Sequence, residues 1–154
     1  MAAISIDEWI GVWSIERSFL FETGGAPERF RGQATVTPVG PALYLYSEEG
    51  YLEGLDHLID ARQSYWIRPE GSALILSFAP DPGRPDLAPP FTELRSDEEG
   101  ALVGEHRCGE DRYRGRYRRI GPDDVEIEWS VEGPRKRGRI ISRLRRVTDE
   151  MGYA

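Results

Sequence analysis

The chain has 154 residues, 39% of them hydrophobic and 31% charged, which is typical of one globular domain and excludes a disordered chain. Its net charge of −7 argues against nucleic acid as a partner. The lone cysteine cannot form an internal disulfide, and no apolar run is long enough for a membrane span or a signal peptide. We therefore expect a single domain, residues 1–154, in a cytoplasmic protein of bacterial type.

The chain begins with one predicted helical turn, and short runs of alternating apolar and polar residues follow it. Residues 6–10 predict a single helical turn capped by Ser5 or Asp7. After it, turn residues separate ten runs that alternate between apolar and polar side chains, as strands do. We place the strands at Val12–Phe21, Arg29–Thr37, Leu43–Tyr51, Asp60–Arg68, Ala73–Phe78, Phe91–Arg95, Ala101–Cys108, Asp111–Arg119, Asp124–Val131 and Arg137–Val147. This pattern predicts an all-β sandwich or barrel.

The longest break in the strand pattern lies between the fifth and sixth runs. Pro80 to Pro90 contains five prolines, which exclude a central strand there and predict a loop. We interpret this segment as a flap at the mouth of a barrel.

A tight hairpin is the most informative local feature. Gly109-Glu110 separates two alternating runs, and a glycine in the first position of a two-residue turn is typical of type II′. Such a turn fixes the register, so that Cys108 faces Asp111 and His106 faces Tyr113. Because the opposite face carries mostly arginine, we expect these four side chains to point inward together.

The strand that follows supports this orientation. A three-residue loop at 121–123 would place Arg118 against Glu126 and Arg116 against Glu128 on the outer surface. These pairs predict an ion ladder outside the barrel rather than a surface for nucleic acid. The same register puts Gly115 opposite Trp129, where a missing side chain leaves room for the indole.

The first strand opens with a motif that resembles the Gly-x-Trp signature of lipocalins. Gly11 and Trp13 match it, and Arg146 on the last strand matches the arginine that stacks on that tryptophan in lipocalins. Such stacking is a cation–π contact of about 1 kcal/mol. The resemblance implies an antiparallel up-and-down barrel of about ten strands, similar to lipocalins and fatty-acid-binding proteins.

A wider pattern resembles the lipocalin-like family called domain of unknown function 6314. The residues that carry this resemblance are Gly11, Trp13, Arg17, Phe30, Gly32, Ala34, Tyr46, Glu48, Gly50, Ala61, Tyr65, Phe78, Gly83, Arg84, His106, Cys108, Asp111, Tyr113, Trp129, Val131, Gly133, Pro134, Lys136, Leu144 and Arg146. The resemblance implies a barrel and no established activity. One departure is that Phe91 precedes Thr92, where the family tends to have histidine after phenylalanine.

Arg17 and Glu48 are the charged residues that alternation places inside. Arg17 shares a face with Trp13 and Phe19, and Glu48 shares one with Tyr46. The guanidinium suits the carboxylate or phosphate of a ligand. The alternative is a buried ion pair with Glu48, because an enclosed charge needs a partner.

The hairpin supplies the candidates for chemistry. His106 could act as a general acid or base oriented by Asp111 or Tyr113, and the alternative is a hydrogen-bonded core histidine. Cys108 is expected to be a small buried side chain rather than a nucleophile. Lys136 follows the turn Gly133-Pro134 and is expected either to reach a ligand or to extend into solvent.

The leading hypothesis is that the barrel binds a small organic molecule with an anionic or hydrogen-bonding head. Its apolar walls would come from Trp13, Phe19, Phe30, Tyr65, Tyr113 and Trp129. The candidate ligand-binding residues are Arg17, Tyr46, Glu48, Tyr65, His106, Cys108, Asp111, Tyr113, Trp129 and Lys136. We expect no cofactor. We also expect no metal, because two histidines and one cysteine give no recognised ligand spacing, and His57 is expected to be solvated.

Three alternatives remain open at this stage. The first is an enzyme of isomerase, cyclase or hydrolase type that uses His106, Asp111 and Tyr113 on a polar substrate. The second is haem bound through one histidine, and the third is an interaction module with a filled barrel. The sequence also leaves the oligomeric state open, a homodimer included.

Overall fold

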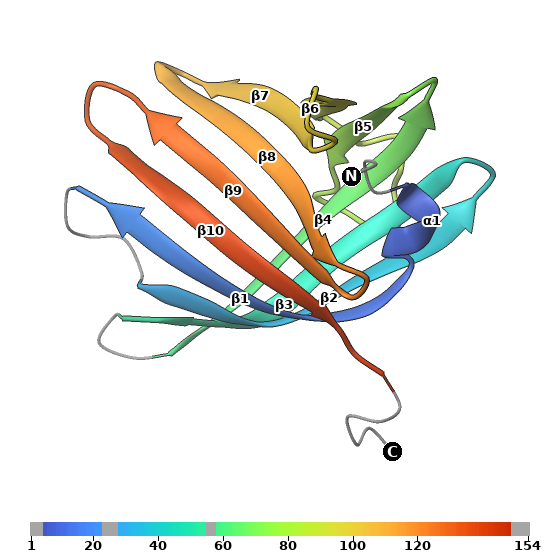
Figure 1. The fold of residues 1–154 in the computed structure, drawn as a ribbon, viewed down its shortest axis with the longest axis horizontal. Coiled ribbons are helices and arrows are strands. Elements are labelled where there is room, and N and C mark those ends of the chain that lie inside the picture. Colours follow the sequence, from blue (N-terminus) through green and yellow to red (C-terminus); the bar gives the residue numbers. More distant parts are fainter. Residues whose placement is uncertain (1–4, 23–27, 55–57, 149–154) are drawn as a thin grey trace.

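The structure is a computed structural model that describes residues 5–22, 28–54 and 58–148. It forms a closed barrel of antiparallel strands with a short helix at one end (Figure 1). The elements are α1 (Ile6–Trp9), β1 (Gly11–Phe21), β2 (Arg29–Gly40), β3 (Leu43–Glu53), β4 (Ile59–Glu70), β5 (Ala73–Phe78), β6 (Pro90–Ser96), β7 (Leu102–Cys108), β8 (Asp111–Gly121), β9 (Asp124–Glu132) and β10 (Arg137–Arg146). The predicted all-β barrel is confirmed.

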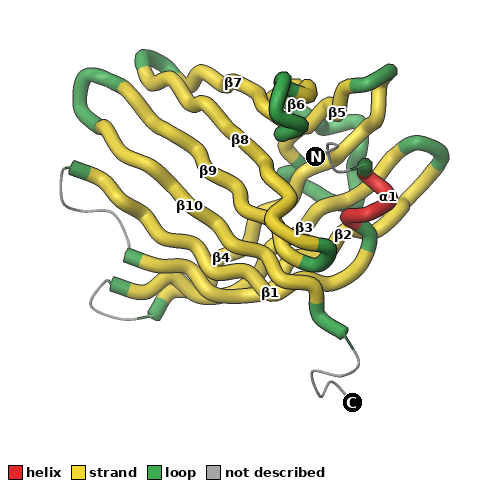
Figure 2. Tube along the Cα trace, viewed as in Figure 1, coloured by secondary structure: helices red, strands yellow, loops and turns green. Residues whose placement is uncertain are grey.

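The strands follow one another around the barrel in chain order. Each pairs with the next, and β10 pairs with β1 to close the circle (Figure 2). Helix α1 lies at one end, which we call the closed end, and the turns β7–β8 and β9–β10 lie at the other, the open end (Figure 1). This up-and-down order leaves every inward side chain facing one enclosed space.

All ten predicted strands are present, although several run further than predicted. The strand β2 continues to Gly40, and β4 extends from Ile59 to Glu70. Backbone pairing continues past the last apolar residue because ladder hydrogen bonds need no apolar side chain. The proline-rich segment is a loop, as predicted, and Pro90 begins β6.

The hairpin between β7 and β8 has the predicted register. Gly109 has a positive φ of 63°, whereas Glu110 does not, as a type II′ turn requires. Cys108 faces Asp111, and His106 faces Tyr113. The turn therefore sends these side chains to one face of the sheet.

The closed end is held by tryptophan and arginine. The guanidinium of Arg146 lies 4.3 Å from the ring centroid of Trp13, which confirms the predicted stacking. The indole nitrogen of Trp13 donates to the carbonyl of Trp9 at 2.9 Å. Trp9 itself stacks on Tyr117 with ring centroids 5.7 Å apart. Helix α1 is thereby fixed as the floor of the barrel.

The outer face carries the predicted arginine ladder with one change of partner. Arg118 and Glu126 form the expected ion pair at 2.7 Å. Arg116 faces Glu128 in the register, but its guanidinium binds Asp97 and Glu99 instead. An arginine side chain is long enough to reach the next turn, so register alone does not select its partner.

Replacing Gly115 tests how tightly Trp129 packs against this part of the barrel wall. A Cβ atom added there would stand 2.5 Å from the indole of Trp129. We expect Gly115→Ala to lower stability by about 1–3 kcal/mol, because the indole cannot move without disturbing its neighbours. Urea unfolding measures this, with Gly40→Ala as the control because a Cβ at Gly40 meets only Leu43, at 4.0 Å. Equal losses in both variants would contradict the packing described here.

Candidate functional site

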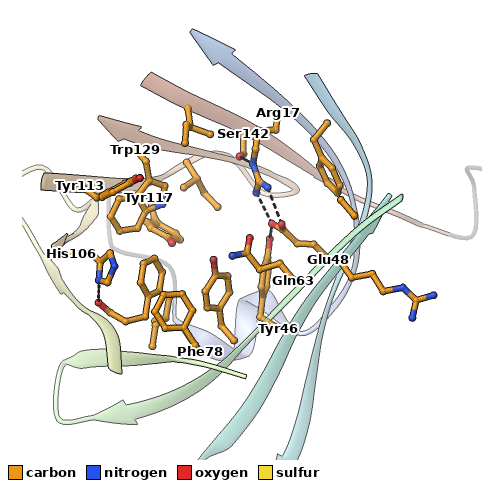
Figure 3. Close-up of a pocket in the computed structure, with 18 of the residues that line it drawn as sticks. Arg17, Tyr46, Glu48, Gln63, Phe78, His106, Tyr113, Tyr117, Trp129 and Ser142 are labelled. Carbon is orange, nitrogen blue, oxygen red and sulfur yellow. Dashed lines mark hydrogen bonds and ion pairs between the residues drawn. The ribbon is translucent and has the colours of Figure 1, made fainter. Parts of the chain in front are cut away.

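A cavity of about 550 Å³ occupies the barrel interior. Most of the side chains around it are apolar or aromatic, and a few are polar (Figure 3). The lining residues are Trp9, Arg17, Phe19, Phe30, Tyr46, Glu48, Leu52, Ala61, Arg62, Gln63, Tyr65, Ile67, Leu76, Phe78, Phe91, His106, Cys108, Tyr113, Tyr117, Ile127, Trp129, Ile140 and Ser142. Enclosed apolar walls with a few polar groups are typical of sites for small organic ligands.

Four residues form a polar cluster on one side of the cavity: Arg17, Tyr46, Glu48 and Ser142. Two nitrogens of the Arg17 guanidinium donate to the two carboxylate oxygens of Glu48, at 2.9 and 2.6 Å. The third nitrogen donates to the hydroxyl of Ser142 at 2.7 Å, and the hydroxyl of Tyr46 donates to Glu48. The side chains of Arg17 and Glu48 are only 17% and 3% exposed. The buried ion pair, one of the two predicted alternatives, is therefore formed.

Burial and neighbouring charges shift the pKa values of the cluster and of the tyrosines near it. Burial lowers the pKa of the Arg17 guanidinium, but the charge and hydrogen bonds of Glu48 outweigh burial and raise that pKa above its usual value. Burial and the Glu48 carboxylate raise the pKa of Tyr46 well above its usual range. Burial also raises the pKa of Tyr65 and Tyr117. The tyrosines accordingly stay protonated, and the cluster carries no net charge.

An aromatic wall lies on the other side of the cavity, centred on Phe91. Its ring centroid is 4.9 Å from that of Tyr65, 4.8 Å from Phe78 and 5.4 Å from Trp129. A register shift between Leu76 and Ser77 in the β5–β6 pairing accompanies the inward position of the Phe91 ring. Flat ring faces arranged in this way suit an aromatic or conjugated ligand.

His106 lies at the edge of the aromatic wall. Its Nδ1 is 2.9 Å from the carbonyl oxygen of Phe91. The imidazole meets the rings of Phe78 and Phe91 edge-on, at centroid distances of 5.7 and 5.0 Å. The group that orients His106 is therefore a backbone carbonyl, whereas the sequence had suggested Asp111 or Tyr113.

Asp111 and Lys136 lie at the rim of the open end. The Nζ atom of Lys136 is 3.5 Å from the Asp111 carboxylate and 3.4 Å from the Tyr113 hydroxyl. Neither Asp111 nor Lys136 lines the cavity, and the two side chains pair with each other between the start of β8 and the turn before β10. Cys108 lines the cavity but is exposed, so the expectation of a buried thiol is wrong. A strand end at an open rim leaves its last side chain in solvent.

The barrel gathers most of the predicted ligand-binding residues around one space. The predicted residues that line the cavity are Arg17, Tyr46, Glu48, Tyr65, His106, Cys108, Tyr113 and Trp129. Trp13, which we had expected in the wall, is buried in the floor instead, because α1 and Arg146 cover it. His57 lies outside the described residues.

Several residues that line the cavity were not predicted, Phe78, Phe91 and Tyr117 among them. Ser142 and Gln63 could have been found by alternation, since each lies two residues from an inward apolar side chain, Ile140 or Tyr65. Trp9 gave no such signal, because nothing in the sequence indicates where a single helical turn docks. Among the described residues, no three His, Cys, Asp or Glu side chains are close enough together to hold a metal ion. In the same part of the chain, no helix is long and apolar enough to cross a membrane.

Fold and cavity together define a lipocalin-like barrel, with an up-and-down strand order, a floor closed by Trp13 and Arg146, and an internal cavity. The chain belongs to the family of unknown function DUF6314, which matches residues 9–146. No protein with a curated description matches the sequence.

Two solved structures resemble the barrel. An S-type phycobiliprotein lyase, CpeS, from Guillardia theta has a TM-score of 0.67 and 14% identity, with 93% of this chain and 90% of that chain covered. A protein of unknown function from the DUF3598 family of Nostoc punctiforme has a TM-score of 0.63 and 11% identity over 96% of this chain. This chain spans about half of that second protein, 51% of its length. At these identities the similarity shows the fold alone.

Proposed function

We propose that the protein binds a small organic molecule inside the barrel, with its flat body on the aromatic wall and its head at the polar cluster. The observation that carries this proposal is one cavity of about 550 Å³ that joins aromatic side chains to a neutral group of hydrogen-bonding side chains. A filled interaction module would leave no such space. The cavity volume is within the range of about 300–1,000 Å³ that small-molecule sites occupy.

The head of this ligand is a hydrogen-bonding group rather than an anion. Glu48 already neutralises Arg17 through two hydrogen bonds, so an anionic head would meet the Glu48 carboxylate as well as the guanidinium. Arg17 has five N–H groups and uses three within the cluster, which leaves two for a neutral oxygen. A carbonyl or hydroxyl oxygen meets this requirement without separating the ion pair.

Native mass spectrometry on protein purified from cells without refolding tests the proposal. We expect an additional mass of a small organic molecule that is lost on collisional activation. The matched control is Ala61→Phe, which places a ring in the cavity next to Gln63 and leaves the polar cluster unchanged. Folded Ala61→Phe protein should carry less of the additional mass. Wild-type protein that is free of any small molecule, and that takes up none from a cell extract, would contradict the proposal.

A further inference from the structure

The hydrogen bond to Phe91 determines which nitrogen of His106 faces a ligand. A backbone carbonyl can only accept, so Nδ1 of His106, 2.9 Å from the Phe91 oxygen, carries a hydrogen. In the neutral imidazole the other nitrogen, Nε2, then holds a lone pair and accepts. The dashed line that starts at His106 in Figure 3 marks this bond.

Nε2 of His106 has no hydrogen-bond partner among the described residues. Across residues 5–22, 28–54 and 58–148, the hydrogen bond of the imidazole to Phe91 is its only one. The ring lines the cavity and is packed against Phe78, Phe91 and Tyr113, so it cannot turn to a donor elsewhere without leaving these contacts. The cavity therefore presents one fixed acceptor on its aromatic side.

The hydroxyl of Tyr113, the residue opposite His106 in the register, is left to donate. Lys136 donates to the Tyr113 oxygen at 3.4 Å, and an ammonium group cannot accept in return. The hydroxyl hydrogen of Tyr113 is thus free for another acceptor. The rings of His106 and Tyr113 are neighbours on the paired strands β7 and β8, with centroids 5.9 Å apart and planes tilted by 53°. Both residues line the cavity.

We infer that the ligand is a phenol-type compound whose hydroxyl donates a hydrogen bond to Nε2 of His106. This inference rests on the proposed function and names the chemical class of the bound molecule. A phenolic hydroxyl donates one hydrogen bond, which is the partner that Nε2 of His106 lacks. The adjacent aromatic wall around Phe91 supplies ring faces for the body that carries this hydroxyl.

A matched pair of probes tests the inference. 2-Naphthol can donate from its hydroxyl, whereas 2-methoxynaphthalene keeps the rings and an accepting oxygen but has no hydrogen to donate. We expect wild-type protein to bind 2-naphthol about tenfold more tightly, because the methoxy compound cannot donate to Nε2 of His106. In His106→Phe, which keeps a ring but removes the acceptor, the two affinities should come within about twofold of each other. The methyl group of 2-methoxynaphthalene takes up the same space in the wild type and in His106→Phe. A difference between the two proteins therefore reports the hydrogen bond and not the size of the compound.

The control is Tyr117→Phe, which removes a hydroxyl from another part of the same cavity and should keep the preference. Fluorescence titration gives both affinities on one protein sample, so partial unfolding lowers both and leaves their ratio unchanged. Equal affinities in the wild type, or a preference that survives His106→Phe, would overturn the inference and leave the proposed function standing. Failure of both probes to bind the wild type would count against the inference and the proposed function together.

Discussion

Replacing Glu48 by leucine is expected to be among the most damaging single substitutions in this protein. The change leaves the Arg17 guanidinium without its counter-charge, and the Arg17 side chain is only 17% exposed. It also leaves the Tyr46 hydroxyl without its acceptor. Removing one member of a buried ion pair typically costs about 3–5 kcal/mol, so we expect a loss of that size in urea unfolding followed by tryptophan fluorescence.

Glu49 is a matched control on the next residue of the same strand. It forms an ion pair with Arg62 at 3.8 Å on the outer face, where both side chains are largely exposed. Such a pair contributes about 0–1 kcal/mol, so Glu49→Leu should change stability little. The double variant Arg17→Met with Glu48→Leu should recover much of the loss, because no uncompensated charge remains. Equal losses for Glu48→Leu and Glu49→Leu would contradict the buried pair.

Replacing Trp9 by alanine is the second large effect that we expect. The indole is 4% exposed, stacks on Tyr117 and closes the floor of the cavity. Its removal would open a hole under the barrel at a cost of about 3–5 kcal/mol. The melting temperature measures this loss and should fall by about 6–20 °C, at about 2–4 °C per kcal/mol in a chain of this size.

Phenylalanine substitutions at Trp9 and Trp13 separate the contribution of packing from that of hydrogen bonding. The indole nitrogen of Trp9 has no partner among the described residues, whereas that of Trp13 donates to the Trp9 carbonyl at 2.9 Å. Trp9→Phe should therefore be milder than Trp13→Phe, which also leaves a buried carbonyl unpaired and weakens the contact with Arg146. The reverse order of melting temperatures would show that the floor is held differently.

The sequence predicted the barrel well because local rules determine its strands. Alternation alone assigned Arg17, Tyr46 and Glu48 to the interior, and all three line the cavity. One glycine turn at Gly109 fixed the register that brings His106 opposite Tyr113. These inferences needed only the two-residue period of a strand and the geometry of one turn.

The contacts within the site could not be predicted, because they depend on distances between strands that a local sequence pattern does not determine. Whether Arg17 pairs with Glu48 or is left unpaired for a ligand depends on the distance between β1 and β3, which lie on either side of β2. The inward turn of Phe91 lies next to a register shift in a short strand pair, which the proline-rich sequence before it does not reveal. For the same reason the orienting partner of His106 was missed, since a backbone carbonyl carries no mark in the sequence.

The contents of the barrel in protein crystallised directly from cells, with no ligand added, test the central claim most directly. The account predicts electron density for a flat organic molecule along Phe91, with one polar end within hydrogen-bonding distance of Arg17 or Glu48. A barrel interior that holds only ordered water, or side chains that have closed the cavity completely, would contradict it.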